Sequence, residues 1–378
     1  MTKTTDARNI VMIAASEADA NLYYATRFIA PDAFAFVQIG GEKTLLMSDL
    51  EVDRARQQAK VQHVLSTSRL AADYAKRHGK KPSYLDLIED FLKSKKIREV
   101  TVPGNFPAEF LDPLRARGFL VTFQSDPFFP ERTLKPPTEV QAITNAIRKT
   151  EAAVTKAIET IRKSVIKKGK LYSNGKLLTA EAIKKIINVH LMENDCIASH
   201  SIVACGLDGV DPHNEGSGTL YANQSIIMDI FPRDSKTRYF ADLTRTVVRG
   251  KAPAKLKKMF EAVREGQEIA FSLIRDGAEG SEIHGKIHKR FEELGFPTGE
   301  VNGRMQGFFH GTGHGLGLEI HEAPRISISK NILKAGHVVT VEPGLYYADA
   351  GGIRLEDVVL VTKTGCTNLT RIPKVLEL

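Results

Sequence analysis

Three histidines, His310, His314 and His321, lie in the segment HGTGHGLGLEIHEAP (310–324), among glycines at alternate positions. Imidazole binds metal ions and transfers protons near neutral pH. Glycine is a poor helix former, so His310 and His314 are not expected to form a helical pair of ligands. The zinc motif HExxH is absent, because Arg325 stands where that motif requires its second histidine. In an extended chain His314 and His321 have opposite parity, which favours one metal ligand and one or two catalytic imidazoles.

Four carboxylates interrupt apolar, strand-like runs in the same half of the chain: Asp229 in SIIMDIF, Asp242 in YFADLTRTVV, Glu342 in HVVTVEPG and Glu356 in GIRLEDVVLV. An ionised carboxylate buried without a partner costs several kcal/mol, so four such residues call for a shared explanation. Carboxylates with an imidazole suit a pair of divalent ions, which lower the pKa of a shared water and polarise a carbonyl. A structural zinc site would use thiolates instead. The pattern therefore predicts hydrolase chemistry at a dimetal centre.

Strand parity predicts which side chains support these ligands. Alternate residues of a strand share a face, so Thr244 should lie beside Asp242, and Arg354 beside Glu356. Asp357 should point the other way. Hydrogen-bonding neighbours of this kind orient metal ligands, and Thr244 and Arg354 are the expected support.

The first half of the chain alternates short strand-like runs with helices. FAFVQI (34–39) and KTLLMS (43–48) flank a Gly-Gly pair and predict a hairpin, and the spacing of apolar residues over 83–97 predicts a helix. The proline-rich segment 125–139 then breaks regular structure and marks a domain boundary. We expect a smaller α/β domain over residues 1–130.

The second half, residues 131–378, places helices and strands in blocks, which favours the α+β class. Helices are predicted from Glu139 to about Lys163 with Thr138 as N-cap, from a cap at Thr179, over 253–275 and over 281–294. Strands are predicted at SIVAC, SIIMDIF, FADLTRTVV, FFHGT, HVVTVEPGLYY and GIRLEDVVLVT. The isolated carboxylates all fall in or beside these strands.

Composition limits the class of protein. At 378 residues, with 42% hydrophobic and 26% charged residues, the chain fits a globular protein of two domains. No apolar run approaches the ~18 residues of a membrane span. Three cysteines without a CxxC pair predict free thiols and a cytoplasmic location. The net charge of +8 is spread over amphipathic helices, so we expect a solvated surface and no nucleic-acid partner.

The motifs resemble the metal-dependent pita-bread peptidases, which include Xaa-Pro aminopeptidases, prolidases, methionine aminopeptidases and the metal-free creatinases. The resemblance covers the chain from about Arg132 to the end. It rests on five segments in the family's order: DPHNEG, MDIFPRDSKTRYFADLTRT, GHGLGLEIHEAP, VEPGLYY and IRLEDVVLVT. A weaker similarity, in DANLYYATRF (19–28), suggests that the N-terminal half resembles the smaller domain of the prolidase, aminopeptidase P and creatinase branches. The implied fold is a pita-bread catalytic domain preceded by that smaller domain.

The resemblance implies a binuclear centre with two divalent ions per subunit. Asp229 would bind one ion, and His314 and Glu342 the other. Asp242 and Glu356 would bridge the two. A site of four carboxylates and one histidine favours Mn²⁺, with Co²⁺ or Zn²⁺ as alternatives.

The resemblance also implies catalytic roles. Glu342 would accept a proton from the attacking water, and His321 would stabilise the tetrahedral intermediate. His213 would bind the substrate and help protonate the leaving nitrogen. His310 would help form the pocket for the residue after the cut, and Arg354 would support the carboxylates.

The function that the resemblance implies is an exopeptidase cleaving between an N-terminal residue and proline, of prolidase or aminopeptidase P type. A methionine-aminopeptidase-like enzyme is the alternative, disfavoured because such enzymes usually lack the N-terminal domain. A catalytically silent binding module on the same fold is disfavoured because every ligand type is present. The expected partners are a small peptide substrate and a second copy of the chain in a homodimer. Substrate length stays open.

Overall fold

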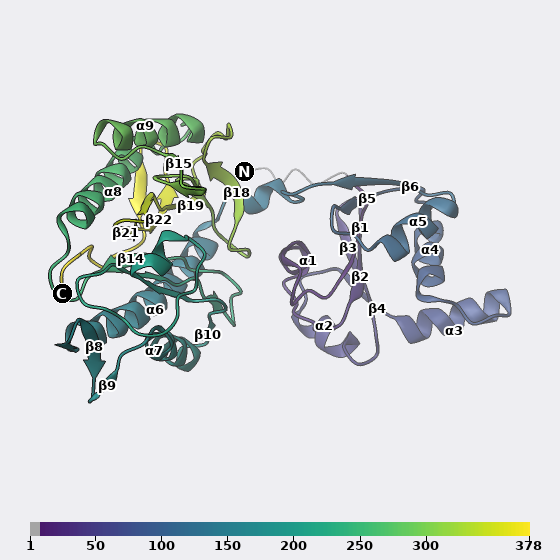
Figure 1. Ribbon diagram of the computed structural model, residues 1–378. Helices are drawn as coiled ribbons and strands as arrows, with labels where there is room; N and C mark the ends of the chain where they lie inside the picture. Colours follow the sequence, from purple (N-terminus) through teal and green to yellow (C-terminus); the bar gives the residue numbers. More distant parts are fainter. Residues whose placement is uncertain (1–7) are drawn as a thin grey trace. The chain divides into compact units, whose positions relative to one another are not determined.

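The computed structural model describes residues 8–378, and the chain divides into two compact units, Met1–Arg132 and Thr133–Leu378 (Figure 1). Each unit has hydrophobic cores of its own. Among the described residues, no helix combines the length and apolar character that a membrane span requires.

The first unit is built on a six-stranded sheet in the order β4-β3-β2-β1-β5-β6. The strands are β1 (Ile10–Ala14), β2 (Phe34–Ile39), β3 (Glu42–Met47), β4 (His63–Ser66), β5 (Glu99–Pro103) and β6 (Leu120–Gln124). The predicted hairpin is confirmed, with β2 and β3 antiparallel and both Gly40 and Gly41 at positive φ. Such a backbone conformation favours glycine.

Helices cover both faces of this sheet: α1 (Ala20–Thr26), α2 (Val52–Gln58), α3 (Thr67–His78), α4 (Tyr84–Ser94) and α5 (Ala108–Ala116). Side chains of β1 alternate between two cores, because Ile10 and Met12 pack with α1 and α2 while Val11 and Ile13 pack with α4 and α5. The predicted helix over 83–97 is confirmed as α4, which begins with a capping box at Ser83. A short 3₁₀ turn, Pro130–Thr133, leads to the second unit.

The second unit begins with α6 (Pro137–Arg162) and α7 (Ala180–Glu193). Thr179 caps α7 as predicted, and its side chain accepts a hydrogen bond from the Ala182 N–H. The prediction that Thr138 caps α6 is wrong. Pro136 holds the cap position and Pro137 the first turn, where a fixed φ and a missing N–H cost nothing.

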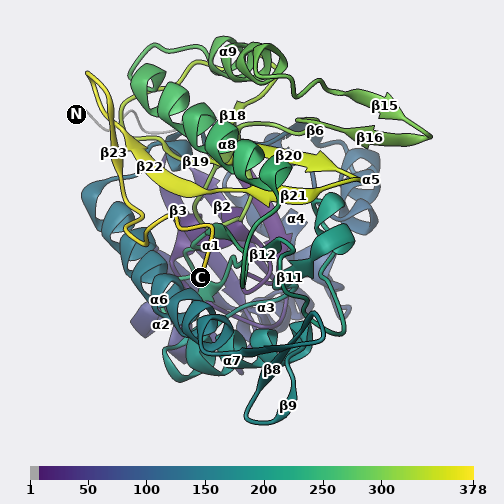
Figure 2. The ribbon, with the colours of Figure 1, turned by 60° about the vertical axis from the view of Figure 1, so that its left-hand side comes forward.

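The remaining helices, α8 (Ala254–Leu273) and α9 (Gly280–Glu293), match their predicted ranges to within two residues. The α6–α7 pair packs with β11 (Ile202–Cys205), β12 (Ile226–Asp229) and β14 (Thr244–Val247), which form one three-stranded sheet. The α8–α9 pair packs with β19 (Val338–Val341), β20 (Gly344–Tyr347), β21 (Gly351–Arg354) and β22 (Asp357–Val361). Figure 2 shows α8 lying along β20, β21 and β22.

A five-stranded sheet in the order β18-β17-β19-β22-β23 joins β17 (Gly313–Gly315), β18 (Glu322–Ile326) and β23 (Cys366–Asn368) to β19 and β22. The smaller strands are β7 (Val165–Lys167), β8 (Lys170–Ser173), β9 (Lys176–Leu177), β10 (Cys196–Ile197), β13 (Arg233–Asp234), β15 (Gly299–Val301) and β16 (Arg304–Gln306), and a 3₁₀ turn spans Gly206–Val210.

Four of the predicted strands differ from the structure, and in FADLTRTVV only Thr244–Val247 form a strand, β14. FFHGT is irregular, and the strand begins one residue later at Gly313. HVVTVEPGLYY divides into β19 and β20 at Glu342, and GIRLEDVVLVT divides into β21 and β22 at Glu356. Both breaks fall at a predicted metal ligand, because the chain turns there to direct a carboxylate inward.

Candidate metal centre

A cavity of about 840 Å³ in the second unit collects most of the predicted site residues. Its lining includes His213, Asp229, Asp242, His310, His314, His321, Glu342, Arg354 and Glu356. Thr244 is the exception, and it lies fully buried behind the lining, where its Oγ1 donates a hydrogen bond of 2.8 Å to Glu356. Residues separated by more than a hundred positions in sequence therefore meet at one site.

The four carboxylates lie at strand ends and not within strands as predicted. Asp229 is the last residue of β12, and Asp242 precedes β14 by two residues. Glu342 directly follows β19, and Glu356 directly precedes β22. A side chain at a strand end is free of the strict alternation between faces, so ligands from separate strands can converge on one point.

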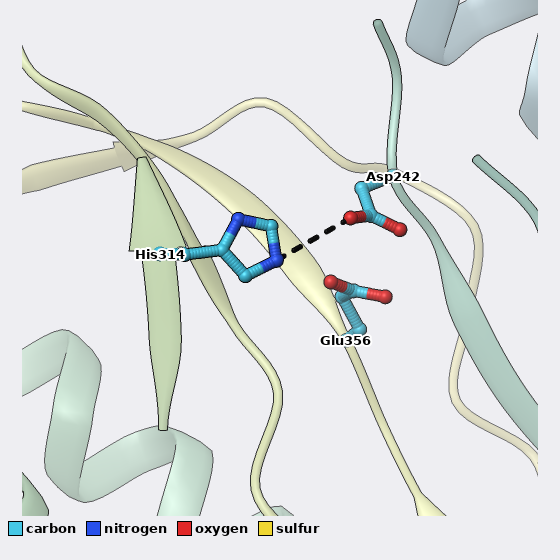
Figure 3. A group of neighbouring side chains, drawn as sticks. All are labelled: Asp242, His314 and Glu356. Carbon is cyan, nitrogen blue, oxygen red and sulfur yellow. Dashed lines mark ion pairs between the residues drawn. The ribbon is translucent and has the colours of Figure 1, made fainter. Parts of the chain in front are cut away.

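The tightest group is Asp242, His314 and Glu356, whose nearest ligand atoms all lie within 4.8 Å of one another. Figure 3 shows the His314 imidazole, carried by β17, directed at both carboxylates. The His314 Nε2 atom lies 3.6 Å from Asp242 Oδ2 and 3.2 Å from Glu342 Oε1. One imidazole nitrogen and several carboxylate oxygens are a donor set for borderline divalent ions.

Asp229 offers a further ligand atom. Its Oδ2 accepts a hydrogen bond of 2.6 Å from Arg354, whereas its Oδ1 is buried and has no hydrogen-bond partner. A buried carboxylate oxygen without a partner is costly, and a metal ion would satisfy it. The residues present thus fit a metal centre.

The charges of the site also favour bound metal ions. Burial, followed by repulsion from Asp229, raises the pKa of Asp242, and burial followed by repulsion from Asp242 raises the pKa of Glu356. Burial is the largest single influence on Glu342 and acts to raise its pKa, but the hydrogen bond from His314 and the charges of His314, His310 and Arg354 together lower that pKa to about 2. Four carboxylates therefore share one cavity, whose lining also includes the guanidinium groups of Arg325 and Arg354. Divalent cations would relieve this repulsion.

The supporting hydrogen bonds differ in part from those predicted. Thr244 bonds Glu356 and not Asp242, because Asp242 lies outside β14, where strand parity no longer holds. Arg354 pairs with Asp229, on a neighbouring segment. Asp357 does point away from the site, where it pairs with Arg245.

The imidazoles other than His314 lie toward the opening or the wall of the cavity. His213 and His321 are exposed, while the carboxylates are mostly buried. His321 keeps an exposed side but is partly enclosed by its neighbours, and this partial burial, then the charges of His314 and Arg325, lowers its pKa to about 4, so its ring is neutral at pH 7. The His321 ring lies edge-on to that of His314, with centroids 4.4 Å apart.

Tyr346 is a member of the site that the sequence analysis missed. Its hydroxyl accepts a hydrogen bond of 2.8 Å from Arg354 and lies 2.9 Å from His310 Nε2. Burial raises the pKa of Tyr346 to about 12, so the hydroxyl keeps its proton. Strand parity could not have identified it, because Glu342 lies in the break between β19 and β20 and parity does not carry across that break.

Two of the histidines that match no motif, His284 and His337, have ordinary packing environments. His284 is buried on α9, and its Nδ1 lies 3.0 Å from Thr312 Oγ1. The buried His337 accepts a hydrogen bond of 3.0 Å at Nδ1 from the Lys334 N–H. Neither lines the cavity.

Comparison with known proteins agrees with this geometry. A family model described as metallopeptidase family M24 matches residues 141–363. The chain is 27% identical over 362 residues to a Xaa-Pro dipeptidase of Pyrococcus horikoshii, covering 94% of this chain and 92% of that protein. It is also 27% identical over 360 residues to a Xaa-Pro dipeptidase of Pyrococcus furiosus, with the same coverage.

Solved structures show the same fold. An X-Pro aminopeptidase from Thermotoga maritima superposes with a TM-score of 0.80 at 22% identity, covering 98% of both chains. A Xaa-Pro dipeptidase from Bacillus anthracis superposes with a TM-score of 0.82 at 22% identity, covering 98% of this chain and 95% of that one. These likenesses confirm the predicted α+β fold of pita-bread type.

Proposed function

The chain belongs to metallopeptidase family M24, and from this premise we propose that it is a binuclear exopeptidase acting on the bond between an N-terminal residue and proline. The observation that carries the proposal is the convergence of Asp242, His314 and Glu356, with the unpartnered Asp229 Oδ1 nearby. The names of the relatives that match along nearly the whole chain support the Xaa-Pro specificity.

We propose that two divalent ions, Mn²⁺ foremost and Co²⁺ or Zn²⁺ as alternatives, occupy the centre. Asp229 would hold one, His314 and Glu342 the other, and Asp242 and Glu356 would contact both. Bound there, the ions would lower the pKa of a water molecule and polarise the scissile carbonyl. The oxygen-rich donor set supports Mn²⁺ as the first choice.

The side chains that line the cavity would then have separate roles in catalysis and substrate binding. The Glu342 carboxylate, ionised at neutral pH, accepts a proton from the attacking water. The neutral His321 ring donates a hydrogen bond to the oxygen on which negative charge develops. The exposed His213 can reach the leaving nitrogen, and His310, held by Tyr346, shapes the pocket beyond the cut.

Three further properties belong to the same proposal: the oligomeric state, the location and the roles of the two domains. We propose a homodimer located in a reducing cytoplasm, and the free state of all three cysteines is compatible with that compartment. We also propose that residues 131–378 carry the catalysis and that 1–130 are an accessory domain. Sedimentation of the purified chain tests the first of these.

The deciding experiment compares substrates with Mn²⁺ added: Xaa-Pro dipeptides, Xaa-Pro-Yaa tripeptides and Met-initiated peptides without proline. We expect cleavage of at least one Xaa-Pro class. Activity confined to the Met-initiated peptides would replace the proposal with a methionine aminopeptidase. A chain that holds no divalent metal after reconstitution would favour a silent binding module.

A pair of variants tests the division of roles. His321→Ala should keep its metal and lose most turnover, whereas Asp242→Ala should lose metal. If His321→Ala emptied the site by metal analysis, the assignment of His321 to the transition state would be wrong.

A further inference from the structure

A buried amide lies between the two chain segments that carry Glu342 and Glu356. Gln267, near the middle of α8, has no exposed surface. Its Nε2 donates hydrogen bonds of 2.8 Å to the Val341 carbonyl and 3.0 Å to the Leu355 carbonyl. Each acceptor belongs to the residue directly before a metal ligand, so this side chain joins the backbones of both ligand segments.

The Gln267 amide forms its hydrogen bonds at the point where β19 and β22 stop pairing. The register of β19 with β22 ends at Val341 opposite Asp357. Beyond that point the Glu342 N–H donates to Thr312 and the Glu356 N–H to Thr244, on two other segments. Gln267 supplies a cross-link at the point of divergence.

Packing alone gives no reason for an amide at this position. The neighbouring α8 side chains that are buried with Gln267, such as Val263 and Ala270, belong to an apolar core. The Gln267 Oε1 atom is buried without a hydrogen-bond partner, a cost that leucine or methionine would avoid. Such an unsatisfied group in a core calls for a role outside packing.

We propose that Gln267 is a positioning residue, which holds Glu342 and Glu356 at the separation that the metal centre requires. The inference rests on the proposed function, because it assumes that both carboxylates bind metal. Metal sites tolerate errors of only about 0.2 Å in ligand distance. A donor shared by the two backbones removes the freedom of one carboxylate to move relative to the other.

The test uses Gln267→Met, which keeps the length and apolar bulk of the side chain and removes both donors. Gln267→Glu keeps the shape but offers at most one O–H donor in place of the two N–H donors, so it cannot donate to both carbonyls at once. Val263→Ala, one turn earlier on α8 and fully buried, is the matched control for a loss of core stability. Calorimetric titration of metal-free full-length protein with Mn²⁺ gives the Kd, and thermal unfolding gives the Tm of each variant.

We expect the Kd of at least one Mn²⁺ ion to rise about 10- to 100-fold in both Gln267 variants, as for other residues that orient ligands. Val263→Ala should lower the Tm and bind Mn²⁺ like the wild type. Saturating Mn²⁺ should return kcat of Gln267→Met to within a few-fold of the wild type.

Two results would overturn the inference. Wild-type affinity for both ions in Gln267→Met would mean that the amide does not set the ligand spacing. Gln267 variants that fail to fold even in saturating Mn²⁺ would assign the residue to the core. Failure of the proposed function is separate, because the wild type itself would then bind fewer than two ions.

Discussion

Replacing Gly313 by alanine is the sharpest test of how the histidine segment is built. A Cβ atom at Gly313 would lie 2.0 Å from the Thr340 carbonyl oxygen, whereas real Cβ contacts essentially never fall below 3.0 Å. The backbones of β17 and β19 must therefore separate by about 1 Å or more. Gly313 precedes the proposed ligand His314, and the Thr340 hydroxyl accepts from the His314 N–H and donates to Glu342.

The expected magnitude follows from this displacement. A shift of about 1 Å exceeds the roughly 0.2 Å that a metal site tolerates, so the Kd for Mn²⁺ should rise at least about 10-fold. Overpacking should also cost about 1–3 kcal/mol, which lowers the Tm by roughly 2–12 °C. Calorimetric titration and thermal unfolding measure both effects.

Gly311→Ala is the matched control within the same segment. Its Cβ would meet nothing closer than 3.3 Å, so a shift of a few tenths of an ångström suffices. We expect near wild-type affinity for Mn²⁺. If Gly313→Ala bound Mn²⁺ as tightly as Gly311→Ala, the inference that glycine is needed there for close strand contact would be refuted.

Three further outcomes are expected. Removal of metal by EDTA should lower the Tm by roughly 5–10 °C, because an ion at a hundred times its Kd stabilises the native state by about 2.7 kcal/mol; equal calorimetric Tm values with and without Mn²⁺ would contradict this. Arg245→Met should cost about 3 kcal/mol in urea unfolding by removing a partner of the buried Asp357, and a cost below about 1 kcal/mol would show that Lys374 alone suffices. Burial lowers the pKa of His337 to about 4. As pH falls from about 6.5 to 4, the unfolded chain therefore binds a proton at His337 while the native state does not, and the wild type loses stability. His337→Asn should lower the free energy of unfolding at pH 7. The difference from the wild type should shrink between about pH 6.5 and pH 4 by less than about 1 kcal/mol per pH unit. A difference that stays constant with pH in urea unfolding would argue against a neutral buried ring.

The chemistry of the site could be predicted from the sequence because its residues are unusual where they stand. An aspartate within SIIMDIF or a glutamate in HVVTVEPG contradicts the apolar pattern around it, and that contradiction is local. The family resemblance followed from the same motifs, and the α+β class followed from the arrangement of helices and strands in blocks; both are confirmed. The cap of α7 at Thr179 was predictable for a similar reason, since a threonine before an apolar periodic run is a local signal.

What the sequence could not predict depends on contacts between distant segments. Thr244 bonds Glu356, 112 positions away, and strand parity around Thr244 carries no information about that partner. In the sequence, Gln267 looks like one more polar residue on an amphipathic helix. Only its hydrogen bonds to the Val341 and Leu355 carbonyls distinguish it. The strand breaks at Glu342 and Glu356 were missed because apolar runs continue on both sides of each residue.

The spread of the ligands along the chain has a consequence for synthesis. Asp229 and Glu356 are 127 positions apart, so at about 5–20 residues per second the ribosome adds the last proposed ligand roughly 6–25 seconds after the first. On the proposed assignment the nascent chain lacks a complete set of ligands throughout that interval. The metal centre can then assemble only after Glu356 has been added.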